Sequence, residues 1–455
     1  MKRKNLIVLV MIGVLILAVG TFFAVKPARN TIFVYEETPA TNASAEPNNT
    51  LPSTETSLDP AIMVEMDLIE NQVSQIRGLS LESIGSRQLM TSQELRQRMR
   101  DELEKELGEG GPDAMQDDLM RMHMFGLLPL DFDLKVFYED LYTEQVGGFY
   151  DQQEKAMFVI SDSGFGGMER ATYAHEFVHA LQDGNFHFDQ KLNYNPQSCR
   201  QDSERCAALQ ALIEGDAQLS ESLWFQTYGT QQDLKDLQAF AIGYQSPVLD
   251  SAPAYLREDL MFPYIYGQQF VQQLYTRGGY EAINHAFEDR QPLSTEQIIN
   301  PAAYPDDLPN NPTLPDFAAV LGGQWETVVE DVVGQWFTYL ILAWGYEPGF
   351  RLYETLAIEA AMGWGGDAYL QMKDPSRDQY AAVVSYNWDT PADAAEALEA
   401  FSSYADLRFG ALQSDGIWEG DHYFSSLVQT SDTSFTWIIT QNLETLMAIQ
   451  AVINE

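Results

Sequence analysis

The segment Thr172–Leu181, with the sequence TYAHEFVHAL, decides the fold because it carries the pattern His-Glu-x-x-His. In a helix, residues four positions apart lie on one face, so His175 and His179 can bind one metal ion while Glu176 lies beside them. Histidine pairs at this spacing are typical of zinc sites in which the glutamate acts as a general base. The sequence therefore predicts a helix that combines a metal with a base.

The motif lies within a longer segment, Met168 to Asp183, that is expected to be one helix. No proline interrupts this segment, and Gly184 follows it at a position typical of a helix end. The whole chain contains six histidines among 455 residues, so two of them at this spacing form a specific pattern. A buried helix whose histidines have only a structural role is the alternative interpretation.

A catalytic zinc ion usually has three protein ligands and one open position, so a third ligand is required. A third histidine at the His-x-x-Gly-x-x-His spacing is absent, because Gln182 and Asn185 occupy those positions. The predicted helix Cys206–Phe225 places Glu214 within an apolar stretch, and we predict Glu214 as the third ligand. The adjacent Gly215 indicates close approach of a neighbouring element, for which the zinc helix is the expected partner.

Polar residues near Glu214 are candidates for holding a zinc-binding imidazole in place. Zinc-bound histidines commonly donate their second ring N–H to another group, and Asp216 and Gln218 could accept it. Ordinary polarity of a helix surface is the alternative for both residues. A structural zinc ion would instead require a fourth protein ligand, for which His187 is the candidate.

At this point the chain resembles a known class of enzymes. His175 and His179 followed by Glu214 are similar to the gluzincin arrangement, in which two histidines and a glutamate bind zinc. Most of the chain after residue 60 also resembles a poorly characterised bacterial group of membrane-anchored or secreted zinc metallopeptidases. The matching segments are Gly147–Asp151, Ala174–Asp183, Glu214–Ala217, Tyr264–Gly267, Ser294–Pro301 and Gly363–Asp367. The resemblance implies one zinc ion per chain, while Asn300 departs from the histidine that the group often has there.

The mechanism expected of such a site is zinc-assisted hydrolysis of a peptide bond. Zinc lowers the pKa of its bound water towards ~7 and polarises the scissile carbonyl group. Glu176 would take the proton of this water and pass it to the leaving amine. A donor must also stabilise the oxyanion, and we predict Tyr264 for this role, with Tyr266 and His285 as further candidates. A packing role is the alternative for each tyrosine, because the chain contains 22 of them.

A β-hairpin is expected just before the zinc helix. Gly148 to Asp151 and Ala156 to Ile160 flank a polar turn at Gln152 to Lys155. An exposed edge of this hairpin could bind an extended peptide by main-chain pairing. Packing of the hairpin against the zinc helix, without contact to substrate, is the alternative.

The first thirty residues predict where the enzyme works. Three basic residues precede an apolar run from Leu6 to Val25 that is long enough to span a bilayer. The basic end should remain in the cytoplasm, so residues 1–30 are predicted to be the signal-anchor of a single-pass cell-membrane protein with its catalytic domain outside the cytoplasm. Cleavage after Gly20 is the alternative and would give a secreted protein.

A disordered linker is predicted at residues 31–59. Residues 36–58 are rich in Thr, Ser, Pro and Asn and contain almost no large apolar side chains, so they cannot form a core. A folded domain is expected from about residue 60, where Asp59 and Pro60 begin a helix. The apolar positions of this helix are Ile62, Met66, Ile69, Val73 and Ile76.

The chain contains two cysteines, Cys199 and Cys206, between the two predicted metal-bearing helices. In an oxidising compartment this pair is expected to form a disulfide that fixes the start of the helix carrying Glu214. A second metal site is the alternative, although two isolated cysteines lack further ligands at suitable spacing.

The expected fold class is α+β, with two modules after the linker. Residues 60–305 should form a mainly helical metallopeptidase domain with one hairpin, and residues 306–455 an α+β module. In the second module we expect helices to about residue 362, including a buried helix at Trp336 to Trp344. Strands are expected at 368–372, 381–387, 423–429 and 435–440.

The charge distribution excludes some classes of partner. The chain has 67 acidic and 26 basic residues, which give a formal net charge of -41. This balance argues against binding to nucleic acids and favours solubility outside the cell. The sequence therefore predicts a zinc peptidase acting on peptide or protein substrates. The alternative is a catalytically inactive surface protein that keeps the zinc fold as a binding or scaffolding module.

Overall fold

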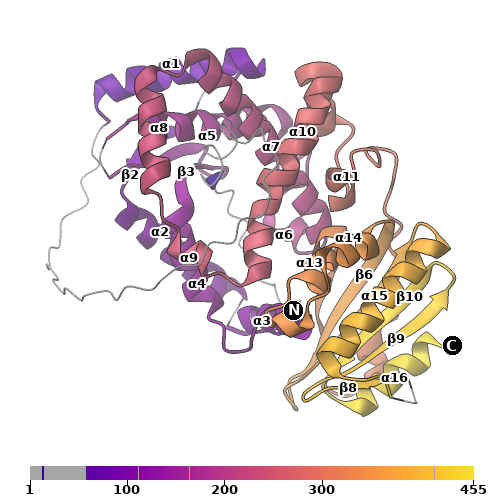
Figure 1. Ribbon diagram of the computed structural model, residues 1–455. Helices are drawn as coiled ribbons and strands as arrows, with labels where there is room; N and C mark the ends of the chain where they lie inside the picture. Colours follow the sequence, from indigo (N-terminus) through magenta and orange to yellow (C-terminus); the bar gives the residue numbers. More distant parts are fainter. Residues whose placement is uncertain are drawn as a thin grey trace, which may run out of the picture.

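The computed structural model describes residues 13–14, 58–82, 84–110, 112–162, 164–413 and 416–454. A helical part in indigo to pink lies beside a C-terminal sheet in orange and yellow (Figure 1). The predicted α+β class is confirmed at this level. The predicted anchor and linker lie outside the described residues, apart from Gly13–Val14 and the residues from 58 onward. Within the described ranges, no helix combines the length and apolar character needed to cross a membrane.

The helical part begins where the sequence predicts it. The Asp59 side chain accepts a hydrogen bond from the Ala61 N–H and caps the first helix, which has Pro60 in its first turn. Of the predicted apolar stripe, Met66, Ile69 and Val73 are fully buried. The helices of this part are α1 (Pro60–Arg77), α2 (Ser92–Gly110), α3 (Pro112–Met124), α4 (Leu134–Gln145), α5 (Gly167–Phe186), α6 (Pro196–Cys199), α7 (Ser203–Tyr228), α8 (Gln231–Gly243), α9 (Pro247–Asp250), α10 (Ala254–Glu288) and α11 (Thr295–Ile299).

A small sheet lies against the zinc helix. The predicted hairpin is confirmed as β3 (Val146–Asp151) and β4 (Ala156–Ile160), which pair antiparallel. The hairpin is extended on one side by β2 (Ser86–Met90), parallel to β4, and on the other by β1 (Gly13–Val14), antiparallel to β3. The prediction of a hairpin alone was therefore wrong, because the short polar segment of β2 lacks the apolar pattern of a strand.

Helix α5, which carries the His-Glu-x-x-His motif, is longer than predicted. Gly184 lies inside the helix, where a Cβ atom would stand 2.3 Å from the Leu81 side chain. The helix ends instead at His187, which adopts a left-handed conformation with φ 52° and donates its backbone N–H to the Asp183 carbonyl. Close packing of the loop after α1 thus explains why a glycine occupies this position. The prediction that Gly184 ends the helix was wrong.

The close approach predicted at Gly215 is present, but its partner is α10. A Cβ atom on Gly215 would stand 2.2 Å from the carbonyl oxygen of Gly267, and one on Gly267 would stand 2.1 Å from the carbonyl oxygen of Ala211. The two glycines therefore let α7 and α10 cross in backbone contact. The zinc helix packs on a different side of α7, so the expected partner was wrong.

The C-terminal part is a sheet of antiparallel strands in the order β5-β6-β7-β10-β9-β8. All four predicted strands are present within it. Its strands are β5 (Glu326–Asp331), β6 (Trp364–Asp374), β7 (Gln379–Trp388), β8 (Trp418–Glu419), β9 (Phe424–Ser431) and β10 (Ser434–Thr440). Its helical segments are α12 (Phe317–Leu321), α13 (Gly334–Ala343), the 3₁₀ turn η1 (Pro348–Phe350), α14 (Glu354–Ala361), α15 (Pro391–Phe409) and α16 (Leu443–Ile453). The expectation of helices alone up to residue 362 was wrong at β5.

Both faces of this sheet are covered, and one face shares its core with the helical part. Successive residues of β7 point to opposite faces. Ala381 and Val383 pack with residues of α12 and α16. Ala382 and Val384 belong to a larger core that contains residues of α15 and also of α7 and α10. The predicted modules are therefore joined by a continuous hydrophobic core.

Candidate metal centre

Two neighbouring helices bring the predicted zinc ligands together. His175 and His179 lie one turn apart on α5, and Glu214 lies on α7, which packs against α5. The Nε2 atoms of the two histidines are 3.2 Å apart. The Oε2 atom of Glu214 is 3.3 Å from Nε2 of His175 and 3.6 Å from Nε2 of His179. Three donor atoms from two helices thus form a compact triangle.

The size of this triangle fits a zinc ion. Ligands arranged tetrahedrally at zinc bond lengths of ~2.0–2.2 Å lie ~3.3–3.6 Å from one another. The three measured separations, between 3.2 and 3.6 Å, agree with that expectation. Two imidazoles and one carboxylate are also a donor set found in catalytic zinc sites. The second oxygen of Glu214, Oε1, is buried and has no hydrogen-bond partner among the described residues, as expected of a ligand for an ion.

The triangle lies in a nearly closed environment. Glu214 and His179 are each 1% exposed, whereas His175 is 7% exposed and is the ligand nearest to solvent. Burial raises the pKa of the Glu214 carboxyl, but the two imidazoles outweigh this effect and hold that pKa at about 2. The carboxylate is therefore ionised at any physiological pH, which a zinc ligand requires.

Each imidazole is oriented through its other ring nitrogen. His175 donates from Nδ1 to the Glu221 carboxylate at 3.2 Å, and His179 donates from Nδ1 to Oε1 of Gln182 at 2.9 Å. These bonds leave the Nε2 lone pair of both rings directed at the triangle. Neither predicted orienting residue fills this role directly: Asp216 acts through Gln182, and Gln218 has a buried oxygen without a partner among the described residues.

A buried ion pair supports this arrangement from behind. The amide of Gln182 donates to the Ile213 carbonyl at 3.0 Å and to Asp216 at 2.9 Å. Asp216 also accepts from Nε of Arg77, on α1, at 2.9 Å, and both side chains are fully buried. The Arg77 guanidinium stacks on the ring of Tyr280, 4.6 Å from its centroid. A chain of polar contacts therefore links His179 to α1 and α10.

Replacing Gln182 by alanine should weaken zinc binding. The substitution removes the acceptor that fixes the His179 tautomer and leaves Asp216 with one donor fewer. Loss of such an orienting partner typically costs ~10–100-fold in metal affinity. A chelator competition titration measures the affinity, and Gln190→Ala, in the loop after α5, serves as the control. Unchanged affinity in Gln182→Ala would show that the triangle holds its shape without this contact.

The general-base candidate Glu176 lies next to the triangle. One of its carboxylate oxygens lies within 4.8 Å of a ring nitrogen of His175 and of His179, and its side chain is fully buried. Oε2 accepts the backbone N–H of Tyr150, in β3, at 3.0 Å, whereas Oε1 has no partner among the described residues. Burial raises the pKa of this carboxyl. One oxygen is thus held by the sheet while the other remains able to accept a proton.

A glycine in β3 makes this contact possible. A Cβ atom on Gly148 would stand 2.6 Å from the Thr172 methyl group and 3.4 Å from Cγ of Glu176. Only a residue without a side chain therefore lets β3 lie flat against α5 at the level of the motif. The sequence predicts a hairpin beside the helix, but no local pattern indicates this role of the glycine.

The three candidates for the oxyanion donor lie elsewhere. Tyr264 lines a cavity of about 340 Å³ whose wall contains no residue of the triangle, and Tyr266 packs on the ring of Trp336. His285 is half-exposed and pairs with Asp289. The prediction of Tyr264 finds no support here, because its helix crosses α7 on the side away from α5. A different tyrosine, Tyr194, is affected by the Glu214 charge. Burial is the larger cause that raises the Tyr194 pKa, and the Glu214 carboxylate raises it further.

His187, the candidate fourth ligand of a structural site, is also remote from the triangle. It lies eight residues after His179, so at ~1.5 Å per residue it stands about 12 Å further along the helix axis. Its side chain lines a surface pocket with Lys155 and Asn185. His187 therefore does not lie close enough to the triangle to be a further ligand.

Zinc affinity should keep rising with pH above neutrality. Burial lowers the pKa of both imidazoles, but carboxylates outweigh it: Glu214 and Glu221 raise the pKa of His175, and Glu214 raises that of His179. Because zinc binds the deprotonated ring, protons compete until the pH exceeds these raised values. Affinity should therefore fall as pH is lowered, already between about pH 8 and pH 7. Chelator competition across this range measures it, and constant affinity there would contradict the raised values.

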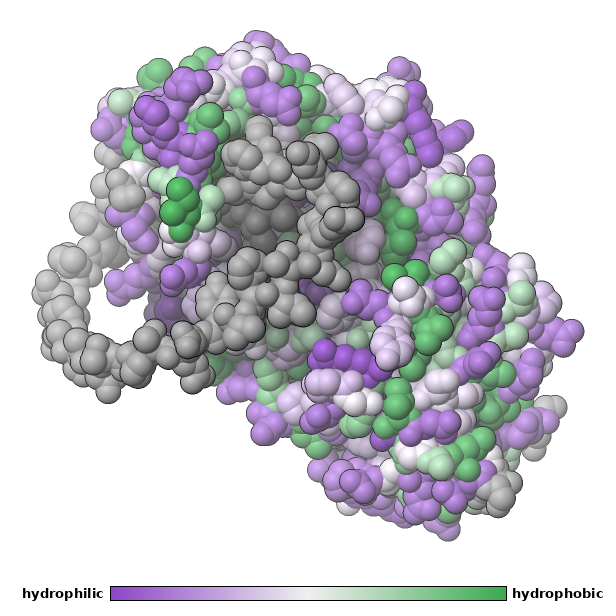
Figure 2. Space-filling model, in the orientation of Figure 1, coloured by the Kyte–Doolittle hydropathy of each residue, from purple (hydrophilic) through white to green (hydrophobic). Residues whose placement is uncertain are grey.

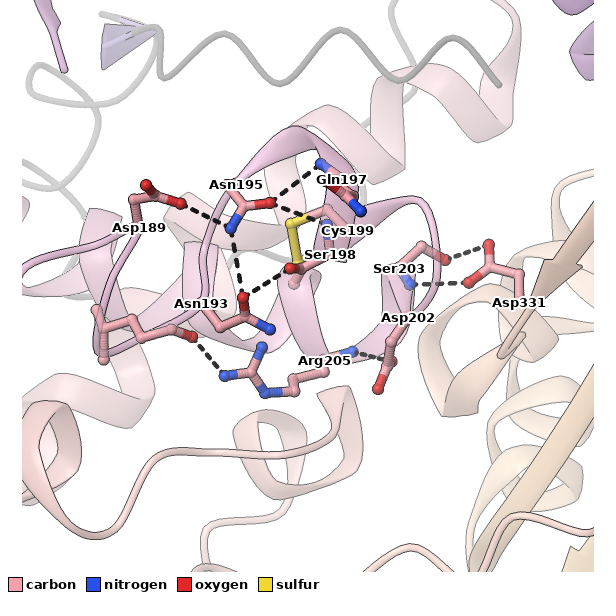
Figure 3. Close-up of a disulfide and its surroundings, with 12 residues drawn as sticks. Asp189, Asn193, Asn195, Gln197, Ser198, Cys199, Asp202, Ser203, Arg205 and Asp331 are labelled. Atoms are coloured by element: carbon pink, nitrogen blue, oxygen red, sulfur yellow. Dashed lines mark hydrogen bonds between the residues drawn. A yellow bond between two sulfur atoms is a disulfide. The ribbon is translucent and has the colours of Figure 1, made fainter. Parts of the chain in front are cut away.

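The predicted disulfide between Cys199 and Cys206 is present, with Cα atoms 5.4 Å apart (Figure 3). It joins α6 to the first turn of α7. Beside it, Asp331 of β5 accepts the backbone N–H and the hydroxyl of Ser203, both at 2.8 Å. The start of the helix that carries Glu214 is thus fixed both covalently and by the C-terminal sheet.

Removing the disulfide should destabilise the protein moderately. Closing a loop with a sequence separation of 7 residues restricts the unfolded chain, and the chain-entropy relation gives about 2.5 kcal/mol for a loop of this size. Urea unfolding of the Cys199→Ala, Cys206→Ala variant should show a loss of that order. Wild-type protein unfolded after reduction with a thiol is the matched control. Equal stability of oxidised and reduced wild type would contradict the expected role.

Comparisons with known proteins address the C-terminal part. A family model described as a domain of unknown function, DUF8575, matches residues 323–450. The matched segment begins just before β5 and ends within α16, so it contains none of the residues of the metal centre. No curated protein and no solved structure matches the chain significantly.

Proposed function

We propose that this protein is a zinc-dependent peptidase that hydrolyses peptide bonds in peptide or protein substrates outside the cytoplasm. The observation that carries the proposal is the triangle of His175, His179 and Glu214 donor atoms with the dimensions of a zinc site. The adjacent Glu176 supplies a buried carboxylate oxygen that has no hydrogen-bond partner in the described part of the chain. A base beside an open zinc site is the arrangement that metal-assisted hydrolysis requires.

The residues divide the chemistry between them. His175, His179 and Glu214 would hold the ion, which supplies a Lewis acid that polarises the carbonyl and acidifies water. Oε1 of Glu176 accepts the proton of the attacking water and returns it to the leaving amine. The N–H of Tyr150 holds the other carboxylate oxygen, so the base keeps its orientation throughout.

The outer edge of β3 is the proposed binding site for the substrate main chain. This edge pairs antiparallel with Gly13–Val14, and no other described segment pairs with it. It borders a cavity of about 1010 Å³ lined by Val146, Gly147 and the start of α5 up to Thr172, one turn before His175. Main-chain hydrogen bonds to this edge would hold an extended peptide in place, and the bound peptide would extend to the metal centre.

A hydrophilic surface, the disulfide and the N-terminal sequence support an exported enzyme. The face shown in Figure 2 is mostly hydrophilic, with smaller hydrophobic areas between the polar ones. The disulfide is typical of an oxidising compartment. We propose that residues 1–30 anchor the protein in the cell membrane with the catalytic part outside, or are cleaved to release it; in either state Gly13–Val14 would leave the edge of β3 with which they pair in the structure.

The second candidate function is a catalytically inactive zinc protein that serves as a binding module at the surface. Binding of zinc by His175, His179 and Glu214 does not require Glu176. The position of that carboxylate, held by β3 with one oxygen free, favours the peptidase.

Cleavage of a peptide library tests the proposal. The purified protein, loaded with one equivalent of zinc, should produce new peptide termini detectable by mass spectrometry. Cleavage should stop after removal of zinc with a chelator and return when zinc is added back. A protein that binds zinc stoichiometrically but cleaves neither peptides nor unfolded proteins would support the binding module instead.

A further inference from the structure

A second group of acidic residues lies at the junction between the helical part and the C-terminal sheet. Glu296 belongs to α11, Asp307 to the loop that follows it, and Asp389 to the turn between β7 and α15. Each offers a carboxylate oxygen, and these oxygens lie within 4.8 Å of one another. Two adjoining segments and a third that is distant in sequence therefore direct carboxylates at one point.

Glu296 is the residue that distinguishes this group from ordinary surface acids. Its side chain is 6% exposed, and none of the described residues forms a hydrogen bond or ion pair with its carboxylate, whose oxygens still reach solvent. Burial, followed by Asp307, Asp389 and Asp393, raises its pKa to about 8. The charged groups that act most strongly on it are all acidic, so no cation among the described residues compensates for its charge.

The surrounding backbone is built to accept these side chains. A Cβ atom on Gly365 would stand 2.9 Å from Oδ1 of Asp389, so glycine leaves the space that this carboxylate occupies. The hydroxyl of Ser294 caps α11 by accepting the Gln297 N–H at 3.2 Å, which fixes the helix that carries Glu296. The acids are thus held in place by the fold even though their charges repel.

We propose that Glu296, Asp307 and Asp389 bind a calcium ion that fastens α11 and its loop to the turn between β7 and α15. Hard oxygen donors without nitrogen or sulfur are typical of Ca²⁺ and Mg²⁺ sites. Oxygens bound to one calcium at ~2.3–2.6 Å can lie up to ~5 Å apart, so three carboxylate oxygens within 4.8 Å of one another fit a single calcium ion. The partly exposed Asp307 and Asp389 leave room for water to complete the coordination.

Titration of the full chain with Ca²⁺ alone tests this site. The zinc-loaded protein should bind one calcium by calorimetry, with a Kd of ~10⁻⁴–10⁻³ M as in extracellular calcium modules. Calcium should also raise the thermal unfolding temperature. Glu296→Gln and Asp389→Asn should each lose calcium affinity at least ~10-fold and lose the thermal shift. Zinc content should stay at one equivalent, because the metal centre lies on other helices.

The controls separate a site from diffuse attraction to an acidic protein. Glu399→Gln removes an exposed charge from α15 and should bind calcium like the wild type. Asp389 is exposed, so Asp389→Asn tests the site even if Glu296→Gln disturbs the core. The proposal is overturned if wild type shows no saturable calcium binding, if both site variants bind as the control does, or if magnesium binds more tightly than calcium.

Discussion

Glu176→Gln should lower the rate of peptide hydrolysis by roughly 10²–10⁴-fold, the usual contribution of a general base. Glutamine has nearly the same shape and can still accept the Tyr150 N–H that holds the wild-type side chain at 3.0 Å. It cannot take a proton from water at neutral pH. Because the zinc ligands are untouched, the variant should retain one zinc ion. The loss should appear in kcat rather than in substrate binding.

The measurement pairs steady-state cleavage of a library-derived peptide with metal analysis. Glu281→Gln, an exposed acid on α10, controls for the loss of one negative charge. Normal zinc with unchanged hydrolysis in Glu176→Gln would exclude this carboxylate as the base and favour the non-catalytic alternative. Loss of both zinc and activity would instead show that Glu176 supports the fold of the centre.

Glu214→Ala should release the zinc ion and remove hydrolysis altogether. In the structure this carboxylate lies 3.3 and 3.6 Å from the two ring nitrogens, and it is buried with them. Its removal leaves two imidazoles, fewer than the three protein ligands of catalytic zinc sites. The affinity loss should exceed the ~10–100-fold expected for an orienting residue.

Metal analysis after dialysis measures this loss. Glu221→Gln is the matched control, because Glu221 contacts His175 only through Nδ1 and should keep zinc with reduced affinity. Full zinc retention by Glu214→Ala would overturn the ligand assignment. The next candidate for the third ligand would then be Asp216, although its carboxylate already accepts hydrogen bonds from Arg77 and Gln182.

Local sequence patterns were sufficient to predict the centre of the site. His175 and His179 are brought together by helical periodicity alone, and Glu214 stands out as an acid in an apolar helix. The hairpin and the disulfide also follow from short segments. The residues around the ligands could not be found this way, because Gln182 and Glu221 acquire their roles from packing between α5 and α7.

The predictions that failed depended on which elements are neighbours. Gly215 does indicate close packing, but a glycine in one helix does not specify which helix approaches it. Tyr264 was chosen by its position after Glu214, while the structure directs it into a cavity near the C-terminal sheet. Strand β5 contains two adjacent large apolar residues with acidic residues near both ends. It therefore lacks the alternation of apolar and polar residues that would indicate a strand.

The segment Ser294–Pro301 also shows that a single sequence does not specify which distant residues lie together. Its resemblance to the metallopeptidase group concerns Asn300, whereas no pattern in the sequence indicates a role for Glu296. That role emerges only when the chain brings Asp307 and Asp389 beside it. Acidic residues separated by almost a hundred positions cannot be grouped from one sequence.

Anomalous diffraction at the zinc edge from crystals of the zinc-loaded protein tests the central claim most directly. One strong peak should lie within bonding distance of Nε2 of His175, Nε2 of His179 and the Glu214 carboxylate, with water as the remaining ligand beside Glu176. A peak at another location, or a fourth protein side chain completing the coordination at this one, would contradict an open catalytic zinc centre.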